Sequence, residues 1–375
     1  MPDDGGGARL PPPHRHRQAA EVQAAPALLG GPRPQGQLVP TTAAERLHRD
    51  AFVLDTHVHA PGFVPQPFAR IYRFVNRATM PPDVGLAALR DAGVDCVVAK
   101  AVGDPVVTRW YRGGPWRAVN LQLDDIERQA AATGAWIVRD AGDLDGDGLG
   151  VILGVEGGDF LGGDVARVDE AHRRGVRVLV IVHMADNELG TTCLPWHGYI
   201  ARFPVRHRRA PGLTAAGAAV VRRMNELGML VDLAHADTAT LRAAVEITSR
   251  PVVSSHSGAR ALDDFARFLT DEEIRAIAST GGAIGLWPFH HRGHGVADVG
   301  ALVAHARHVA GLAGPEHLCI GTDMNGVPGV MDGYRGERDL PLVTAALLDG
   351  GFAEAEVRGI LGDNIRRVLK EVWTQ

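Results

Sequence analysis

Short runs of hydrophobic residues recur along the chain and alternate with longer amphipathic stretches. The runs are nearly continuous in Val, Ile, Leu and Ala, which is typical of parallel strands buried on both faces. Counted from residue 52, they predict eight strands: Phe52–His57, Val94–Lys100, Val151–Glu156, Val176–His183, Met229–His235, Val252–His256, Ala283–Trp287 and Leu318–Asp323.

The stretches between these runs have helical periodicity. They predict helices at Val84–Asp91, Val119–Ala132, Val165–Arg173, Ala215–Leu227, Thr238–Ile247, Asp271–Ser279 and Val299–Leu312, then a helical tail at Leu340–Trp373 with a break near Gly350. Eight alternating strand and helix units predict an α/β fold of the (β/α)8 TIM-barrel type. A doubly wound open sheet is the alternative, but the chain has no Gly-x-Gly-x-x-Gly or Walker-type loop between a strand and a helix.

The first part of the chain differs in composition from the rest. Residues 1–43 are rich in Pro, Gly, Ala, Gln and Arg and predict a flexible leader. Residues 44–375 then predict a single catalytic barrel domain that ends in helices.

Charge and cysteine content narrow the classes of function. A net charge of −5 gives no electrostatic case for binding nucleic acid or a membrane surface, and no apolar run approaches the ~20 residues that span a bilayer. The N-terminus lacks the apolar core of a secretory signal. Cys96, Cys193 and Cys319 cannot all pair and are not closely spaced, which disfavours a cysteine metal site and favours a reducing, cytoplasmic location.

Residues that can bind metal stand at the ends of the predicted strands, where the catalytic groups of a barrel lie. Alone, a carboxylate there often caps a helix, and a histidine is more often a structural hydrogen bonder. Together they are the residues of a metal-activated hydroxide site and favour an amidohydrolase-type barrel. They are His57, His59, Glu156, His183, His235, His256 and Asp323.

Several motifs resemble the membrane (renal) dipeptidase family, a branch of the metal-dependent amidohydrolases. The similarity runs from about Asp55 to Val368. The motifs are Val231-Asp232-Leu233-Ala234-His235, Ser255-His256-Ser257-Gly258-Ala259-Arg260-Ala261-Leu262, Glu156-Gly157, Ile320-Gly321-Thr322-Asp323 and the closing Gly362-Asp363-Asn364.

The resemblance implies a role for each of these site residues. His57 would bind a first metal, Glu156 would bridge two metals, and His235 and His256 would bind the second. His183 would contact the substrate carbonyl, and Asp323 would handle the proton of the attacking water. Arg260 would hold a substrate carboxylate, since its planar fork suits bidentate pairing.

The opening motif departs from the family, which usually has His-x-Asp where this chain has His57-Val58-His59. Met324-Asn325 likewise replaces the family's Phe-Asp. His59 can still bind metal, but the site loses a negative charge that would screen two cations from each other. We expect one or two divalent ions, Zn²⁺ with two ions favoured, and a weaker first site or a single-metal enzyme is the alternative.

Lys100 stands at the end of the second predicted strand. It is either a carboxylated metal ligand or a structural lysine, and the structural role is favoured.

The sequence thus predicts a metal-dependent hydrolase that cleaves the amide bond of a dipeptide or a similar small molecule. Two alternatives remain: a specialised amidohydrolase that acts on another amide, a lactam or an ester, and a non-catalytic metal-binding homologue. The resemblance also makes a homodimer a reasonable expectation.

Overall fold

The computed structural model describes residues 42–65, 68–200 and 210–373. Residues 1–41, and with them nearly all of the predicted leader, lie outside the described part. The described chain forms a nine-stranded parallel sheet in which β2 pairs with β1 on one side and with β4 on the other, so that the sheet closes. The predicted (β/α)8 barrel is therefore confirmed.

Eight strands make up the closed barrel, in the order β2-β1-β11-β8-β7-β6-β5-β4. They agree with the predicted strands to within a few residues at either end. Their bounds are β1 Leu54–Val58, β2 Cys96–Val102, β4 Gly150–Glu156, β5 Val176–Val180, β6 Leu230–Asp232, β7 Val252–Ser257, β8 Ala283–Leu286 and β11 Leu318–Ile320.

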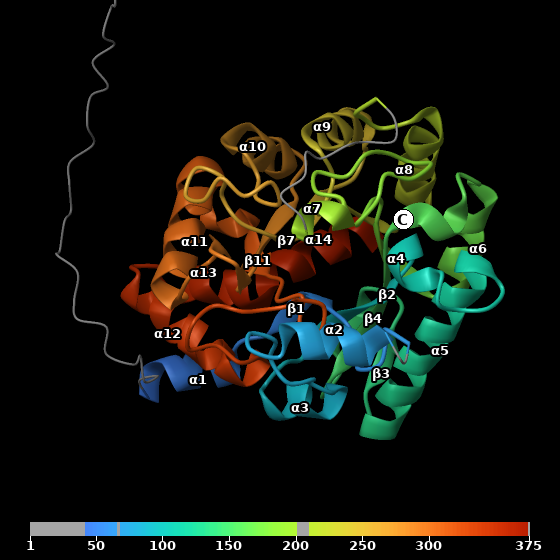
Figure 1. The fold of residues 1–375 in the computed structure, drawn as a ribbon. Coiled ribbons are helices and arrows are strands. Elements are labelled where there is room, and N and C mark those ends of the chain that lie inside the picture. The colour runs from blue at the N-terminus through green and yellow to red at the C-terminus, as the bar shows by residue number, and fades with distance from the viewer. Residues whose placement is uncertain (1–41, 66–67, 201–209, 374–375) are drawn as a thin grey trace, which may run out of the picture. The chain divides into compact units, whose positions relative to one another are not determined.

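Helices surround these strands (Figure 1). The longer ones are α1 Thr42–Asp50, α2 Phe68–Asn76, α3 Leu86–Asp91, α5 Gly114–Thr133, α6 Ala166–Arg174, α8 Ala215–Leu227, α9 Thr238–Ile247, α10 Asp271–Ser279, α11 Val299–Ala313, α12 Leu340–Asp349 and α14 Asn364–Trp373. Shorter helices are α4 Pro105–Thr108, α7 Trp196–Ile200 and α13 Glu354–Arg358, and a small hairpin joins β9 His290–His291 to β10 His294–Gly295.

A further strand, β3 (Trp136–Val138), was not predicted. It pairs with the first half of β4, at Gly150–Ile152, whereas β5 pairs with the second half. Three residues are too few to show a period, so the hydrophobic pattern gives no signal for such a strand.

The inside of the barrel is closed at the N-terminal ends of the strands. One apolar cluster joins inward residues of all eight barrel strands to α14. Its members on α14 are Ile365, Val368, Leu369 and Val372, all fully buried. Because this end is filled by packed side chains, only the opposite end is left for a site.

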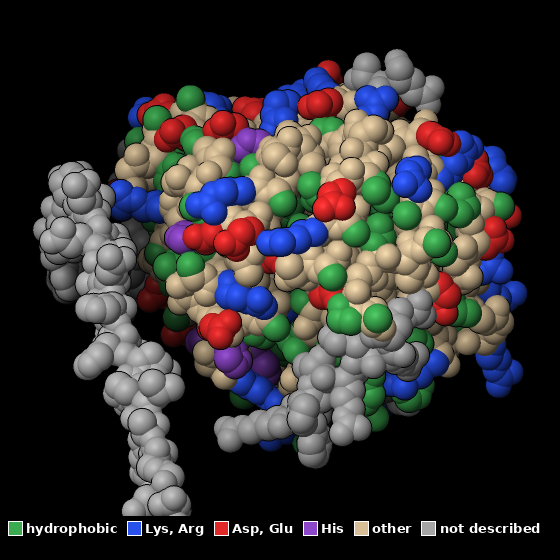
Figure 2. Space-filling view, turned by 90° about the horizontal axis from the view of Figure 1, so that it is seen from above, with side chains coloured by type: hydrophobic (Ala, Val, Ile, Leu, Met, Phe, Trp, Pro, Cys, Tyr) green, Lys and Arg blue, Asp and Glu red, His purple; other side chains and the backbone are tan. Residues whose placement is uncertain are grey.

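On the face shown in Figure 2, basic and acidic side chains are interspersed, so neither sign of charge dominates it. Among the described helices, none combines the length and the apolar character that crossing a bilayer requires.

Candidate metal centre

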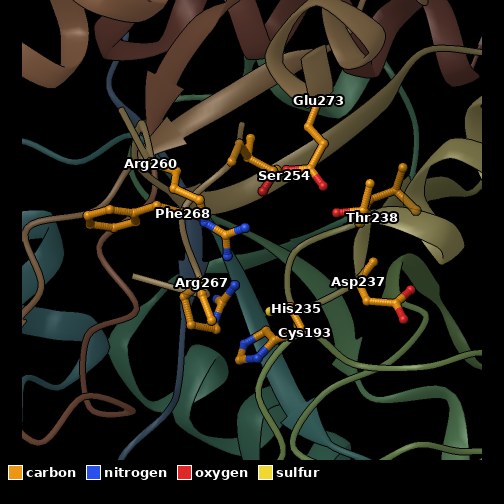
Figure 3. A pocket seen from close by; sticks show the side chains of 13 residues that line it. Cys193, His235, Asp237, Thr238, Ser254, Arg260, Arg267, Phe268 and Glu273 are labelled. Atoms are coloured by element: carbon orange, nitrogen blue, oxygen red, sulfur yellow. The ribbon is translucent and has the colours of Figure 1, made fainter. Parts of the chain in front are cut away.

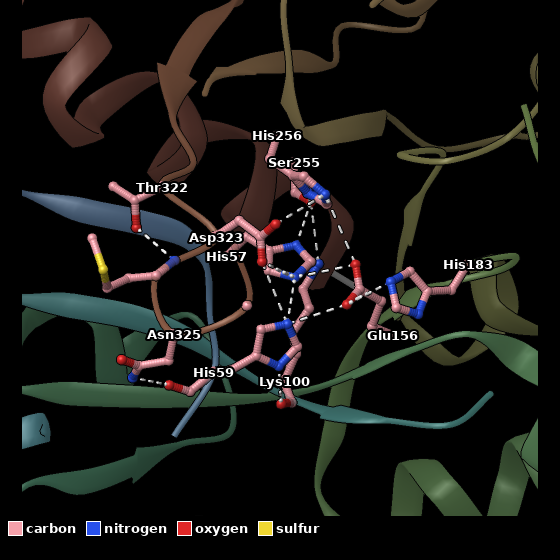
Figure 4. Close-up of polar contacts among 12 residues, drawn as sticks. His57, His59, Lys100, Glu156, His183, Ser255, His256, Thr322, Asp323 and Asn325 are labelled. Atoms are coloured by element: carbon pink, nitrogen blue, oxygen red, sulfur yellow. Dashed lines mark hydrogen bonds and ion pairs between the residues drawn. The ribbon is translucent and has the colours of Figure 1, made fainter. Parts of the chain in front are cut away.

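Glu156, the last residue of β4, lies at the centre of the candidate site and is 1% exposed. Imidazoles from five places in the chain surround its carboxylate (Figure 4). The Nε2 atoms lie at 3.3 Å for His57, 3.2 Å for His59, 3.4 Å for His183, 3.2 Å for His235 and 3.9 Å for His256. The structure therefore brings together every predicted histidine, at the C-terminal ends of the strands.

The cluster contains donor sets that suit a divalent ion. Three groups have ligand atoms within 4.8 Å of one another: His57 with His59 and Asp323, His57 with Glu156 and His256, and Glu156 with His183 and His235. The Oε1 atom of Glu156 is buried and has no hydrogen-bond partner in the described chain. A Zn²⁺-like ion binds imidazole nitrogens and carboxylate oxygens. Because Oε1 of Glu156 lacks a hydrogen-bond donor, it is free to bind such an ion, and the residues fit a metal centre.

Backbone hydrogen bonds hold the ends of β1 and β11 together beside this cluster. The N–H of Asp323 donates to the carbonyl of His57 over 2.8 Å, and the N–H of His59 donates to the carbonyl of Met324 over 2.9 Å. Asn325 donates from its side chain to the carbonyl of His59 over 2.6 Å. The positions of both β1 histidines are therefore tied to that of Asp323.

Three residues of the site have left-handed backbone, with φ of 66° at His235, 54° at Asp323 and 67° at Asn325. Such conformations cost non-glycine residues roughly 1 to 3 kcal/mol each and persist where the surroundings enforce them. His235 and Asp323 direct their side chains toward the centre, whereas the Asn325 side chain bonds the backbone of His59 and Val84.

The cluster perturbs the pKa values of its members. Burial alone would raise the pKa of the Glu156 carboxyl, but the neighbouring His183 and His57 hold it well below its usual range. Burial would lower the pKa of His59, but hydrogen bonds to Asp323 and Glu156 raise it to about 9. The carboxylates of Asp323 and Glu156, which raise this pKa, would also attract a metal cation.

Asp104 is a site residue that the sequence reasoning missed. Its carboxylate accepts a hydrogen bond from Nδ1 of His183 and also caps α4 by accepting from the N–H of Val106 over 2.6 Å. The capped helix holds the carboxylate in place, and the carboxylate orients the imidazole. The Asp104-Pro105 pair, an N-cap followed by proline, was the sequence signal that could have revealed this helix start.

Two arginines line a cavity of about 150 Å³ beside His235 (Figure 3). Arg267 is 3% exposed, and its Nη2 atom donates to Nε2 of His256 over 2.8 Å. The predicted Arg260 is more exposed, and its Nε atom donates over 3.4 Å to the backbone carbonyl of Phe265. Arg267, which sequence reasoning missed, thus contacts the predicted ligand His256 directly, whereas Arg260 lines the same cavity and bonds to the backbone.

A family model described as membrane dipeptidase (peptidase family M19) matches residues 41–375. The chain belongs to this family. The resemblance found in the sequence motifs is thereby confirmed.

A dipeptidase, AclJ of Aspergillus oryzae, is 31% identical over 225 residues, which are 59% of this chain and 51% of AclJ. The matched region thus spans about half the length of that relative.

Solved structures share the fold. An amidohydrolase from Pseudomonas aeruginosa is 21% identical, with a TM-score of 0.69 over 88% of this chain and 99% of that one. A metallopeptidase from Rhodobacter sphaeroides, bound to a phosphinate mimic of the dipeptide L-Ala-D-Ala, is 21% identical, with a TM-score of 0.70 over 86% of this chain and all of that one. At this level of identity the likeness concerns the barrel alone.

Proposed function

We propose that this M19 protein is a metal-dependent dipeptidase that hydrolyses the amide bond of a dipeptide or a dipeptide-like small molecule. The observation that carries the proposal is the buried Glu156 carboxylate, surrounded by five imidazoles and adjacent to Asp323 at the catalytic end of a barrel. Family membership supports it, as do the dipeptidase AclJ and the dipeptide mimic bound to the Rhodobacter enzyme.

We further propose Zn²⁺ as the metal and two ions as the full complement. His57, His59 and Asp323 would hold one ion, and His235 and His256 would hold the other. Glu156, whose oxygens lie 3.2–3.9 Å from the Nε2 atoms of these four histidines, would be shared by both. Ions in these positions would lower the pKa of a water molecule and polarise the substrate carbonyl.

The chain's own residues would supply the remaining chemistry. Asp323 would accept the proton of the attacking water and pass it to the leaving nitrogen. His183, held by Asp104, points Nε2 toward the centre, where it can stabilise negative charge on the carbonyl oxygen. Arg267 and Arg260 line one cavity and would bind the substrate carboxylate.

The direct test is turnover of a peptide library. Protein loaded with Zn²⁺ or Mn²⁺ is assayed against L,L- and L,D-dipeptides and acyl-amino acids, and at least one class should be cleaved. The matched control is Asp323→Asn, which should retain at least the ion held by Glu156, His235 and His256 and lower kcat by about 10² to 10⁴. Absence of turnover across the library would contradict the proposal.

His59 favours a second candidate, a specialised amidohydrolase that acts on another amide, a lactam or an ester. The imidazole stands where the family usually has a carboxylate, next to Asp323 at 3.5 Å. Retained metal with turnover of such a compound, and none of dipeptides, would identify it. The homodimer and the cytoplasmic location stay predictions, which light scattering and cell fractionation would test.

A further inference from the structure

Helix α2 turns large apolar side chains to the solvent. Ile71 is 58% exposed, Phe74 67% and Val75 66%, and α2 has no buried residue. These three positions are spaced at i, i+3 and i+4, so they share one face of the helix. In a surface helix such a face normally packs against the core. Contiguous apolar side chains that remain exposed mark an interaction surface.

Trp110, which follows α4 and is 46% exposed, extends this apolar face. The ring of Phe68, the first residue of α2, stacks on the Trp110 ring with the two centroids 5.2 Å apart. Phe68 lies on the same side of α2 as Ile71 and Val75, at i, i+3 and i+7. Two segments of the chain therefore form one apolar surface, the α2 patch, made of Ile71, Phe74, Val75 and Trp110.

The sequence around the α2 patch is basic. Residues 56–82 and 105–123 contain six arginines and no Asp, Glu or Lys, although the whole chain has 44 acidic residues against 39 basic ones. Arg73 pairs with Asp83. The net charge of −5 therefore hides a local positive excess. The other five arginines of these two stretches are exposed: Arg70, Arg77, Arg109, Arg112 and Arg117.

Two of these arginines lie directly over the apolar side chains. Cζ of Arg77 is 4.4 Å from the centroid of the Phe74 ring, and Cζ of Arg109 is 5.5 Å from that of Trp110. Positive charge and apolar surface thus occur together at one place. Amphipathic helices that lie in the headgroup region of a membrane have this composition, with aromatic and aliphatic side chains toward the acyl chains and basic ones among the headgroups.

We propose that the α2 patch docks on the surface of a membrane that contains anionic lipids. The apolar side chains enter the headgroup region and the arginines pair with lipid phosphates, while the helix lies on the surface and does not cross it. This inference goes beyond the proposed function and does not depend on it.

Charge complementarity decides between lipid and other occupants. A second copy docked through the same patch would bring two sets of arginines together, which like charges oppose. An acidic protein would need a surface shaped to receive side chains that protrude from a helix with no buried residue. A lipid surface supplies negative charge and yields to the side chains that enter it.

The inner side of α2 adjoins the candidate metal centre. The Tyr72 hydroxyl donates to the carbonyl of Gly326 over 3.2 Å, and the N–H of Gly326 donates to the carbonyl of Asp323 over 3.0 Å. Docking through α2 would therefore hold the loop that carries Asp323 close to the lipid surface.

The test is vesicle flotation of the full chain at about 0.1 M and about 0.5 M salt. Wild type should bind phosphatidylcholine vesicles with about 30 mol% phosphatidylglycerol at least about tenfold more tightly than pure phosphatidylcholine vesicles, and the higher salt should weaken this binding. Arg70→Gln/Arg77→Gln should weaken it about 10- to 30-fold and reduce its salt dependence. Phe74→Gln/Val75→Gln keeps every charge and should weaken it by about tenfold or more at both salt concentrations.

A matched variant on α1 separates local from overall charge. Arg46→Gln/Arg49→Gln removes the same two charges at exposed positions of α1 and should bind as wild type does. Equal binding of wild type to both kinds of vesicle would overturn the inference, as would equal losses in the α1 and α2 arginine variants. Light scattering without vesicles provides the remaining check. A wild-type dimer that dissociates in Phe74→Gln/Val75→Gln would assign the α2 patch to a second copy of the chain and overturn the inference as well.

Discussion

The Nδ1 atom of His59 donates a hydrogen bond to the backbone carbonyl oxygen of Lys100 across 3.0 Å. A carbonyl only accepts, so Nδ1 carries a hydrogen and Nε2 is the nitrogen left to bind a metal ion. Nε2 lies 3.2 Å from Glu156 and 3.5 Å from Asp323, the two carboxylates whose hydrogen bonds raise the pKa of the ring. His59 is thus oriented to bind metal through Nε2, once that nitrogen has released its proton, at the position where the family usually has a carboxylate.

The preference among metals should therefore change in the His59→Asp variant. A carboxylate adds negative charge and an oxygen donor, which suit Mn²⁺ better than an imidazole does. We expect the ratio of Mn²⁺ to Zn²⁺ affinity to rise by about tenfold in competition dialysis. His59→Asn, which lacks the added charge, is the control. An unchanged ratio in His59→Asp would show that His59 does not bind the metal.

The Asp104→Asn variant tests the orientation of His183. Asparagine is also a good helix N-cap, so α4 should remain while the negative charge beside Nδ1 is lost. We expect kcat to fall by about 10- to 100-fold with little change in KM, measured on the best dipeptide substrate. Asp298→Asn makes the same change at the N-cap of α11 and should be neutral. A rise in KM with an unchanged kcat would argue against this role.

The two arginines of the cavity should differ in their effect on substrate binding. In Arg267→Lys the charge remains but the bidentate fork is lost, so KM should rise by about 10- to 100-fold for substrates with a free carboxylate. Arg260→Lys should change KM less, since Arg260 is the more exposed. Amidated peptides, which lack the carboxylate, serve as the control substrate. A larger rise in KM for Arg260→Lys than for Arg267→Lys would favour Arg260 as the residue that binds the substrate carboxylate, as the sequence predicted.

Glu337, 1% exposed, should make stability depend on pH. Burial and the nearby Asp55 raise its pKa to about 8. The folded state keeps this proton while the unfolded chain loses it above its own pKa, so stability falls as pH rises from about 4.5 to 8. Glu337→Gln should therefore gain about 2 to 4 kcal/mol over wild type between pH 5 and pH 8 in urea unfolding. Exposed Glu246→Gln is the control, and parallel curves for Glu337→Gln and wild type would contradict the assignment.

The sequence predicted the barrel because buried parallel strands are nearly continuous apolar runs, and each of the eight runs corresponds to one barrel strand. It could not reveal β3, whose three residues Trp136–Val138 are too short for a period. Strand ends were placed less well than strand centres: the run through His183 continues beyond the last paired residue, Val180. Ile181 and Val182 are also apolar, so the hydrophobic pattern does not show that β5 ends at Val180.

The candidate ligands were found because each stands at or just beyond the end of a predicted strand, as Glu156 and His256 do. Arg267 was not found, since it lies in the loop after β7, where no period shows which side chain turns inward. The contacts of Ser255 with Lys100 and with Nδ1 of His57 were equally out of reach. They join residues up to 198 positions apart, which only the folded arrangement brings together.

The closure of the barrel by α14 sets an order of events during synthesis. His57 is made early, but the apolar floor beneath it needs Ile365, Val368 and Val372, more than three hundred residues later. A nascent chain on the ribosome therefore carries most of its histidines before it has a sealed core to hold them in place. Stable metal loading should therefore wait until α14 has been made and has packed against the strands.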